Sequence, residues 1–253
     1  MPGCTALRFT SSRLLRIFQN RRMRWLRSVR STSSTSDAAQ MTDSELKALK
    51  EQYDRDGFVV LRNYLSNAEL KDLHDHAVPL ATAILAKQDS HGKYRNLLKS
   101  LNRHDDWFDD QLNTGKHLPL VRYLVGDDVF GATAAWFDRP EGETGGVDPH
   151  VDAIGRERNP DAGATIWFAL DPVNVGNGCL HYLRGSHRNA YPATIPIPGI
   201  DTESDDACPM ELEPGDAAIH NALTVHWSGG NTTGLPRRAV SYFYFGARAH
   251  AAL

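Results

Sequence analysis

Cysteine is scarce in this chain of 253 residues, which contains only Cys4, Cys179 and Cys208. Three cysteines cannot make a disulfide framework, and because no two of them form a C-x-x-C pair, neither a zinc ribbon nor a redox motif is predicted. This usage is typical of a reducing compartment. The chain also lacks any run of about 18 apolar residues, so we expect no membrane insertion. Its apolar content of 41% and charged content of 23% are those of a globular protein with one main core.

Acidic residues are absent from the first 36 positions, which carry eight arginines. Residues 37–253 hold the other 20 of the 28 basic side chains and all 31 acidic ones, a balance of −11. An acidic body is a poor partner for nucleic acid, because neutralising a phosphate backbone takes clustered cations. We therefore expect a small-molecule substrate and no nucleic acid. The oligomeric state cannot be inferred from the sequence.

Residues 1–40 have the features of a segment separate from the domain. On a helical wheel one side carries Leu7, Leu14, Phe18 and Trp25, and the other carries Arg13, Arg16, Arg24 and Arg27. An amphipathic, acid-free segment rich in arginine and serine is typical of a transit peptide, and we expect mitochondrial targeting. The alternative is a disordered basic tail on a cytoplasmic protein. No apolar h-region indicates a secretory signal, and the C-terminal Ala251-Ala252-Leu253 is not the peroxisomal tripeptide.

The remaining residues, 41–253, are predicted to form a single domain whose first part is mainly helical. Thr42-Asp43-Ser44-Glu45 and Ser66-Asn67-Ala68-Glu69 are capping boxes, each of which indicates the start of a helix. The second helix is expected to run to about Lys87. Between the two helices Gly57–Leu61 has the composition of a short strand. Residues 88–115 are predicted to be polar and irregular.

From about Val129 the sequence changes to short runs typical of β-strands, punctuated by Gly, Pro, Asn and Asp. These runs are Ala132–Asp138, Ala164–Leu170, Cys179–Leu183, Asp216–Asn221 and Ala239–Phe245. Short strands at this spacing favour a sandwich or barrel, a jelly roll among them. Residues 191–215 are first proline-rich and then acidic. We interpret them as a long loop that is either a lid or an insert.

The tripeptide His150-Val151-Asp152 is a candidate metal site. On an extended strand residues i and i+2 point to the same face, so the imidazole and the carboxylate can bind one cation. The alternative is a surface turn after Pro149. His226 follows 74 residues after Asp152, and two histidines with one carboxylate form the facial triad that holds non-haem Fe(II). His220 has the same strand parity as His226 and stays a rival ligand or neighbour of the metal.

Arg237 lies eleven residues after His226 and predicts a dicarboxylic co-substrate. A guanidinium grips a carboxylate through two parallel hydrogen bonds, which lysine cannot do. Neighbours on a strand face opposite sides, so only one of Arg237 and Arg238 can point inward. We predict that Arg237 does so and that Arg238 faces solvent. Asp138 and Asp148 are interpreted as ordinary loop acids.

These motifs together resemble the phytanoyl-CoA dioxygenase family over about residues 43–247. They are His150-x-Asp152, Trp167, Asn177-Gly178-Cys179-Leu180, Gly185-Ser186-His187, Pro214-Gly215-Asp216, His226-x-Ser228-x-x-Asn231 and Arg237-Arg238-Ala239. Members use Fe(II), 2-oxoglutarate and O2, and have a double-stranded β-helix (jelly-roll) core. The resemblance implies a mainly β fold with flanking helices. It implies that His150, Asp152 and His226 bind iron, that Arg237 binds the distal carboxylate of 2-oxoglutarate, and that Trp167 lines the co-substrate pocket.

Other residues have weaker assignments. Ser228 either donates a hydrogen bond to the co-substrate or stabilises a turn. Lys99 and Arg103 are candidates for further co-substrate contacts. Arg156 and Arg158, in the loop after the proximal ligands, either meet an anionic substrate such as an acyl-CoA or lie in a solvated loop.

The function that follows is hydroxylation of a small-molecule or acyl-type substrate, with release of succinate and CO2. Asp152 fills the position that related halogenases leave open for halide, so hydroxylation is favoured over halogenation. Two alternatives stay open. One is a Zn(II)-dependent hydrolase on the same triad, and the other is a catalytically silent jelly-roll module that binds a ligand.

Overall fold

A computed structural model describes residues 41–248 apart from 89–95, 153–162 and 193. The segment 1–40 lies outside these described residues. The transit peptide or basic tail, the mitochondrial location and a helical N-terminal third as a whole therefore stay predictions. Arg156 and Arg158 also lie outside the described residues, so their roles stay predictions too.

Helices of the described residues begin where the capping boxes predict. α2 (Asp43–Asp56) starts after Thr42, and α3 (Asn67–Leu85) starts after Ser66. In both, the cap side chain accepts from the backbone N–H three residues on, and the glutamate there accepts from the cap's own N–H. α5 (Leu118–Val125) follows later in the chain. None of the described helices has both the length and the apolar composition needed to cross a membrane.

The prediction of an irregular segment at 88–115 is wrong for most of its described part. It contains β2 (Leu97–Lys99), a short 3-10 helix and α4 (Asp106–Thr114). Asp105 caps α4 by accepting from the N–H of Trp107. Phe108 and Leu112, four positions apart, are the two buried residues of α4. The polar residues between them conceal this short apolar face in the sequence.

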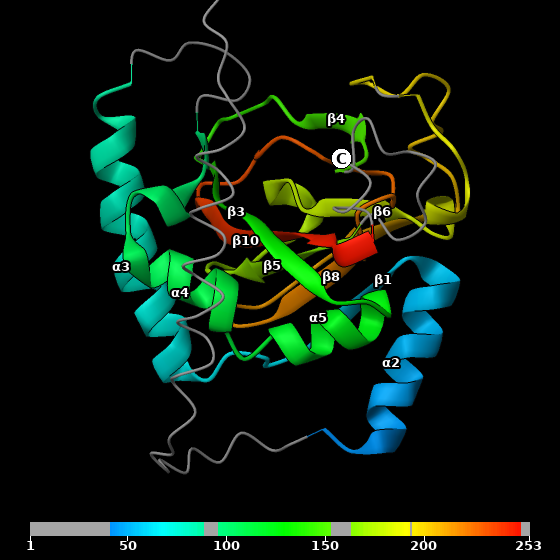
Figure 1. The fold of residues 1–253 in the computed structure, drawn as a ribbon. Coiled ribbons are helices and arrows are strands. Elements are labelled where there is room, and N and C mark those ends of the chain that lie inside the picture. Colours follow the sequence, from blue (N-terminus) through cyan, green and yellow to red (C-terminus); the bar gives the residue numbers. More distant parts are fainter. Residues whose placement is uncertain (1–40, 89–95, 153–162, 193, 249–253) are drawn as a thin grey trace, which may run out of the picture. The chain divides into compact units, whose positions relative to one another are not determined.

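The described residues form ten strands in two antiparallel sheets. Figure 1 labels most of these strands. The six-stranded sheet has the order β1 (Phe58–Leu61), β8 (Ala217–Asn221), β5 (Ala164–Ala169), β10 (Arg237–Gly246), β3 (Val129–Arg139) and β2. The four-stranded sheet has the order β4 (Val147–His150), β9 (His226–Ser228), β6 (Leu180–Leu183) and β7 (Ala207–Met210). The strands predicted by composition are confirmed, and β7 is an addition inside the segment 191–215.

Alternation along β10 separates the core from the site. Val240, Tyr242 and Tyr244 belong to the main apolar cluster, which also holds residues of α3, α4 and α5. Arg237, Ser241 and Phe243 instead line a cavity on the other side of the strand. Each fully buried large apolar side chain contributes roughly 1.5–3 kcal/mol, so the cluster holds β10 in one register. Packing on one face of β10 thereby fixes the position of the cavity residues on the other.

The segment 191–215 contacts the strand that carries the metal-binding motif. Ile197 donates its N–H to the carbonyl of Pro149 over 2.8 Å. The Ile197 side chain is buried with Val151 and Trp227. Whether the segment acts as a lid stays a prediction.

Candidate metal and co-substrate site

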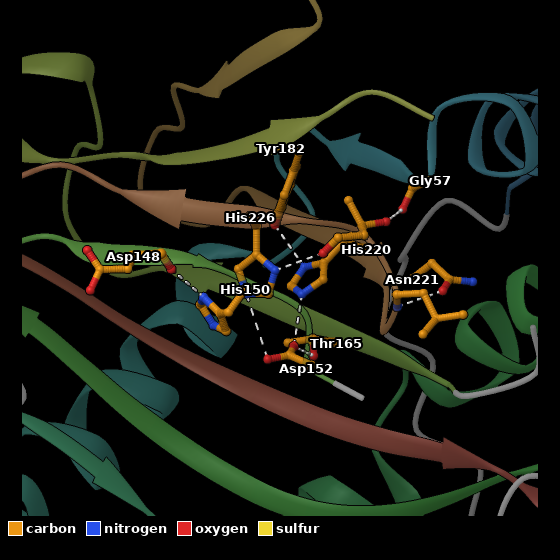
Figure 2. A network of polar contacts seen from close by, with 11 residues as sticks. Gly57, Asp148, His150, Asp152, Thr165, Tyr182, His220, Asn221 and His226 are labelled. Atoms are coloured by element: carbon orange, nitrogen blue, oxygen red, sulfur yellow. Dashed lines mark hydrogen bonds and ion pairs between the residues drawn. The ribbon is translucent and has the colours of Figure 1, made fainter. Parts of the chain in front are cut away.

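Three side chains of the predicted triad converge, as Figure 2 shows. His150 ends β4 and His226 begins β9, and the two residues are partners across this strand pair. Their ring centroids are 4.1 Å apart. Asp152 follows β4, and one donor atom from each of the three residues lies within 4.8 Å of the others. The tripeptide is therefore no surface turn, and its two donors face a histidine from a remote segment.

The tautomers of the two histidines follow from their backbone contacts. Nδ1 of His150 lies 2.8 Å from the carbonyl oxygen of Asp148, and Nδ1 of His226 lies 3.0 Å from that of Thr224. A carbonyl only accepts, so each Nδ1 carries the proton and donates it. Each Nε2 is then left with its lone pair for a metal. Asp148, predicted to be an ordinary loop acid, lies in β4 and orients His150 through its carbonyl.

Asp152 is held through one of its two oxygens. Thr165 donates its hydroxyl to Oδ2 over 2.5 Å, and Nε2 of His220 lies 3.0 Å from the same oxygen. Oδ1 lies 3.7 Å from Nε2 of His226. Burial alone would raise the pKa of Asp152, but His226 and His220 outweigh it and hold this pKa well below its usual range. The carboxylate is therefore ionised.

Burial lowers the pKa of both triad histidines to about 4. Neutral imidazoles and an ionised carboxylate are the protonation states in which these groups bind a metal. Two histidines and one carboxylate on one side of a cation form the donor set that suits Fe(II) with open positions. The residues present therefore fit a mononuclear iron centre.

His220 lies beside the site, but it does not lie on the same strand as His226, as the parity argument had assumed. It lies on β8 of the six-stranded sheet, whereas His226 lies on β9 of the other sheet, with a turn between them. Their rings are nevertheless 4.6 Å apart. Among the described residues the group able to hold a metal is His150, Asp152 and His226, and His220 contacts its carboxylate.

Arg237 is a buried cation, and only 2% of its surface is exposed. It donates to the carbonyl oxygen of Gly178 over 2.7 Å, and its Nε has no hydrogen-bond partner. No ion pair joins it to a carboxylate of the described residues. Burial, and then the charge of Arg139, lower its pKa to about 9. A guanidinium without a counterion in such a place is a ready anion site.

Arg238 turns away from this cavity, as strand alternation requires. It does not face solvent as predicted, because it forms a two-point ion pair with Asp171. Its backbone N–H donates to the same carboxylate. Only about a quarter of its side chain is exposed. A nearby carboxylate satisfies Arg238, in contrast to Arg237.

One cavity of about 160 Å³ joins the triad to Arg237. Trp167 and Ser228 also line it, together with Lys99. Arg103 is not among its lining residues. Trp167 is buried on β5, with its ring 5.7 Å from Cζ of Arg237.

Ser228 has contacts that bear on both of its predicted roles. Its hydroxyl oxygen accepts from the N–H of Val147 over 3.2 Å and from the guanidinium of Arg139 over 3.3 Å. The first contact ties β9 to β4, and the second faces the cavity. Both interpretations of Ser228 therefore stay open.

Several cavity residues were not predicted. Arg139 lies on β3 directly opposite Arg237, 98 residues away in the chain. Asp138, predicted to be a loop acid, also lies in β3 and lines the cavity, and burial raises its pKa. Thr165 on β5 contacts Asp152. Nothing in the residue types themselves singled these out, because their roles depend on strand pairing.

Comparison with known proteins gives relatives that include two dioxygenases. Dioxygenase lolE1 of Epichloe uncinata is 34% identical over 127 residues, which is 49% of this chain and 48% of that protein, so the chain spans about half its length. Phytanoyl-CoA dioxygenase 1 of Oryza sativa subsp. japonica is 24% identical over 255 residues, or 81% of this chain and 89% of that protein.

The fold has solved counterparts too. The epimerase SnoN from nogalamycin biosynthesis, solved with Fe3+, alpha ketoglutarate and nogalamycin RO, superimposes with a TM-score of 0.67. The superposition covers 81% of this chain and 85% of that one at 24% identity, so it shows a shared fold. The sequence model of the phytanoyl-CoA dioxygenase (PhyH) family matches residues 53–239, which is well over half of the chain. With that match, the chain belongs to the phytanoyl-CoA dioxygenase family, whose enzymes are non-haem dioxygenases that use iron, 2-oxoglutarate and O2.

Proposed function

We propose that this protein hydroxylates a small-molecule or acyl-type substrate in an Fe(II)- and 2-oxoglutarate-dependent reaction. The two antiparallel sheets then form a double-stranded β-helix (jelly roll) whose interior holds the site. His150, Asp152 and His226 would bind the iron through Nε2, a carboxylate oxygen and Nε2. Their convergence in one cavity supports this assignment.

The observation that carries the proposal is the Arg237 guanidinium in the same cavity as the triad. Leaving a buried cation without a counterion is costly, and the 2-oxoglutarate carboxylate remote from the metal would remove that cost. Trp167, whose buried Nε1 has no hydrogen-bond partner, forms a wall beside it. The Zn(II)-dependent hydrolase alternative gives no reason for a buried guanidinium in the same cavity as the metal ligands.

When bound, Fe(II) supplies the oxidising chemistry, in which O2, 2-oxoglutarate and a substrate C–H bond give succinate, CO2 and an alcohol. The chain's own residues bind and orient. His150, Asp152 and His226 would hold the metal from one side and would leave its remaining positions to 2-oxoglutarate and O2. Phe137, Leu180 and Trp227 form an apolar part of the cavity wall, which would limit the access of water to the reacting centre.

Asp152 bears on the outcome of the reaction. A protein carboxylate on the metal occupies the position that halogenases leave for halide, which favours hydroxylation. The Zn(II) hydrolase and the silent ligand-binding module are not favoured, because the chain belongs to a family of dioxygenases and retains the residues that this chemistry needs. Contact of Arg156 and Arg158 with an anionic substrate stays part of the proposal.

The test is reconstitution of the purified chain with Fe(II) and 2-oxoglutarate without oxygen, followed by admission of O2. We expect O2-dependent succinate formation, accelerated by one member of a panel of small metabolites and acyl-CoA compounds. Mass spectrometry of that member should show the gain of one oxygen atom. Tight binding of Zn(II) together with no succinate above the metal-free control would contradict the proposal.

A further inference from the structure

A third imidazole beside the metal ligands forms part of a buried chain of contacts. His220 has 2% of its surface exposed and lies between the Tyr182 hydroxyl and the Asp152 carboxylate (Figure 2). Its Nδ1 is 2.9 Å from the Tyr182 oxygen, and its Nε2 is 3.0 Å from Oδ2 of Asp152. Tyr182 itself is fully buried on β6. The three residues come from three different segments.

The direction of each hydrogen bond in this chain follows from the carboxylate. An ionised carboxylate only accepts, so Nε2 of His220 carries the proton and donates to Oδ2. In a neutral imidazole the other nitrogen then accepts, so the Tyr182 hydroxyl donates to Nδ1. This tautomer satisfies both His220 nitrogens and leaves no lone pair for a metal. It explains why a histidine so close to the triad is not a fourth ligand.

The consequence concerns the two oxygens of Asp152. Oδ2 accepts from both His220 and Thr165. Oδ1 takes part in neither bond and is the oxygen nearer to His226. We propose that His220, oriented by Tyr182, acts with Thr165 as a positioning pair that makes Asp152 bind the metal through Oδ1 alone. This inference rests on the proposed function, because it assumes that the triad holds the metal.

One-oxygen binding matters for a centre that has to accept two further partners. A carboxylate that bound through both oxygens would occupy one more metal position. Partners that fix the orientation of metal ligands contribute roughly 10- to 100-fold to metal affinity. The alternative is that His220 only fills buried space between the sheets, in which case any side chain of similar size would serve.

Two matched pairs of variants separate these roles. His220→Gln keeps an N–H donor and His220→Leu fills the space without one. Thr165→Ser keeps the hydroxyl, and Thr165→Val keeps the shape without it. The measurement is Co(II) binding to the metal-free full chain by calorimetry, with the visible spectrum of the bound Co(II) as a second readout that responds to coordination number.

We expect His220→Leu and Thr165→Val to bind Co(II) roughly 10- to 100-fold more weakly than the wild type and to change the spectrum. His220→Gln and Thr165→Ser should recover most of the affinity. Thermal unfolding of each metal-free variant serves as the folding control. Should His220→Leu fail to fold, the Thr165 pair decides by the same criterion.

Equal Co(II) affinity and an unchanged spectrum within each pair would overturn the positioning role while leaving the proposed function intact. A wild-type chain that does not bind Co(II) at all would overturn the proposed function and this inference with it.

Discussion

His150 and His226 are direct partners across strands β4 and β9, although 76 residues separate them in the chain. Each ring is turned by a backbone carbonyl two residues before it. The two Nε2 atoms therefore face the same cavity before any metal arrives. This preorganisation makes metal binding depend on side chains and not on refolding of the strands.

Removal of a triad side chain should abolish turnover. In His150→Ala and Asp152→Ala we expect succinate formation to fall to the level of the metal-free protein, because the site loses one of its three metal donors. The measurement is succinate release, with bound iron determined in parallel. His74→Ala, on α3 and away from the cavity, is the control and should match the wild type. Full activity in either triad variant would refute the ligand assignment.

Replacement of Arg237 should weaken 2-oxoglutarate binding. Arg237→Lys keeps the charge and loses the two-point grip, so the Kd should rise roughly 10- to 100-fold, which corresponds to about 1.4–2.8 kcal/mol. Calorimetry in the presence of the metal without O2 gives this value. Arg238→Lys is the matched control and should change the Kd little, because Arg238 pairs with Asp171 outside the cavity. A larger effect at position 238 than at 237 would reverse the assignment.

The stability of the domain should fall on acidification partly because of His117. Burial lowers its pKa to about 3, its Nε2 lies 2.5 Å from the Tyr244 hydroxyl, and Lys116 is a neighbouring cation. Below pH 6.5 His117 binds a proton in the unfolded chain but stays neutral in the folded chain. The contribution of neutral His117 to the free energy of unfolding is therefore complete above pH 6.5 and is lost as the pH falls towards 3.

At pH 5 this loss amounts to about 2 kcal/mol for a single group. Denaturant unfolding of the wild type and of His117→Gln at pH 7 and pH 5 measures it. The variant should lose roughly 2 kcal/mol less than the wild type between the two pH values. Identical losses would show that His117 does not contribute to acid sensitivity.

The Asp216 carboxylate ties the start of β8 to the end of β1. It is buried and accepts from the backbone N–H groups of Asn63 and Glu213 and from the Arg62 guanidinium. Asp216→Ala should lower the free energy of unfolding by about 3 kcal/mol, because the backbone N–H groups of Asn63 and Glu213 lose a charged acceptor. Arg62→Ala removes the exposed partner and should cost less than about 1 kcal/mol. Equal losses in the two variants would contradict this account.

Local signals in the sequence were sufficient for elements whose causes are local. The capping boxes at Thr42 and Ser66 predicted where α2 and α3 begin, because a cap is a contact between residues three apart. The β-rich run at 239–245 predicted β10 for a similar reason. The same kind of evidence failed for α4, where two buried residues in a polar segment are too few to show a period.

The motif residues of the site were also readable, because H-x-D, the distal histidine and Arg237 are recognised by residue type and spacing. Their neighbours were not. Arg139, Thr165 and the role of His220 depend on which strands pair and in which register. Register is set by the sum of many apolar contacts across the sheets, and no single residue carries it.

By itself, then, the order of amino acids determined which chemical groups are present and where most helices and strands form, because those depend on near neighbours in the chain. Only the tertiary structure decided that Arg237 shares a cavity with the metal ligands and has no counterion among the described residues, while Arg238 has one. It also decided that His220 donates to Asp152 in place of binding the metal. The physical reason is that burial and hydrogen-bond partners come from remote segments, and folding alone brings those segments together.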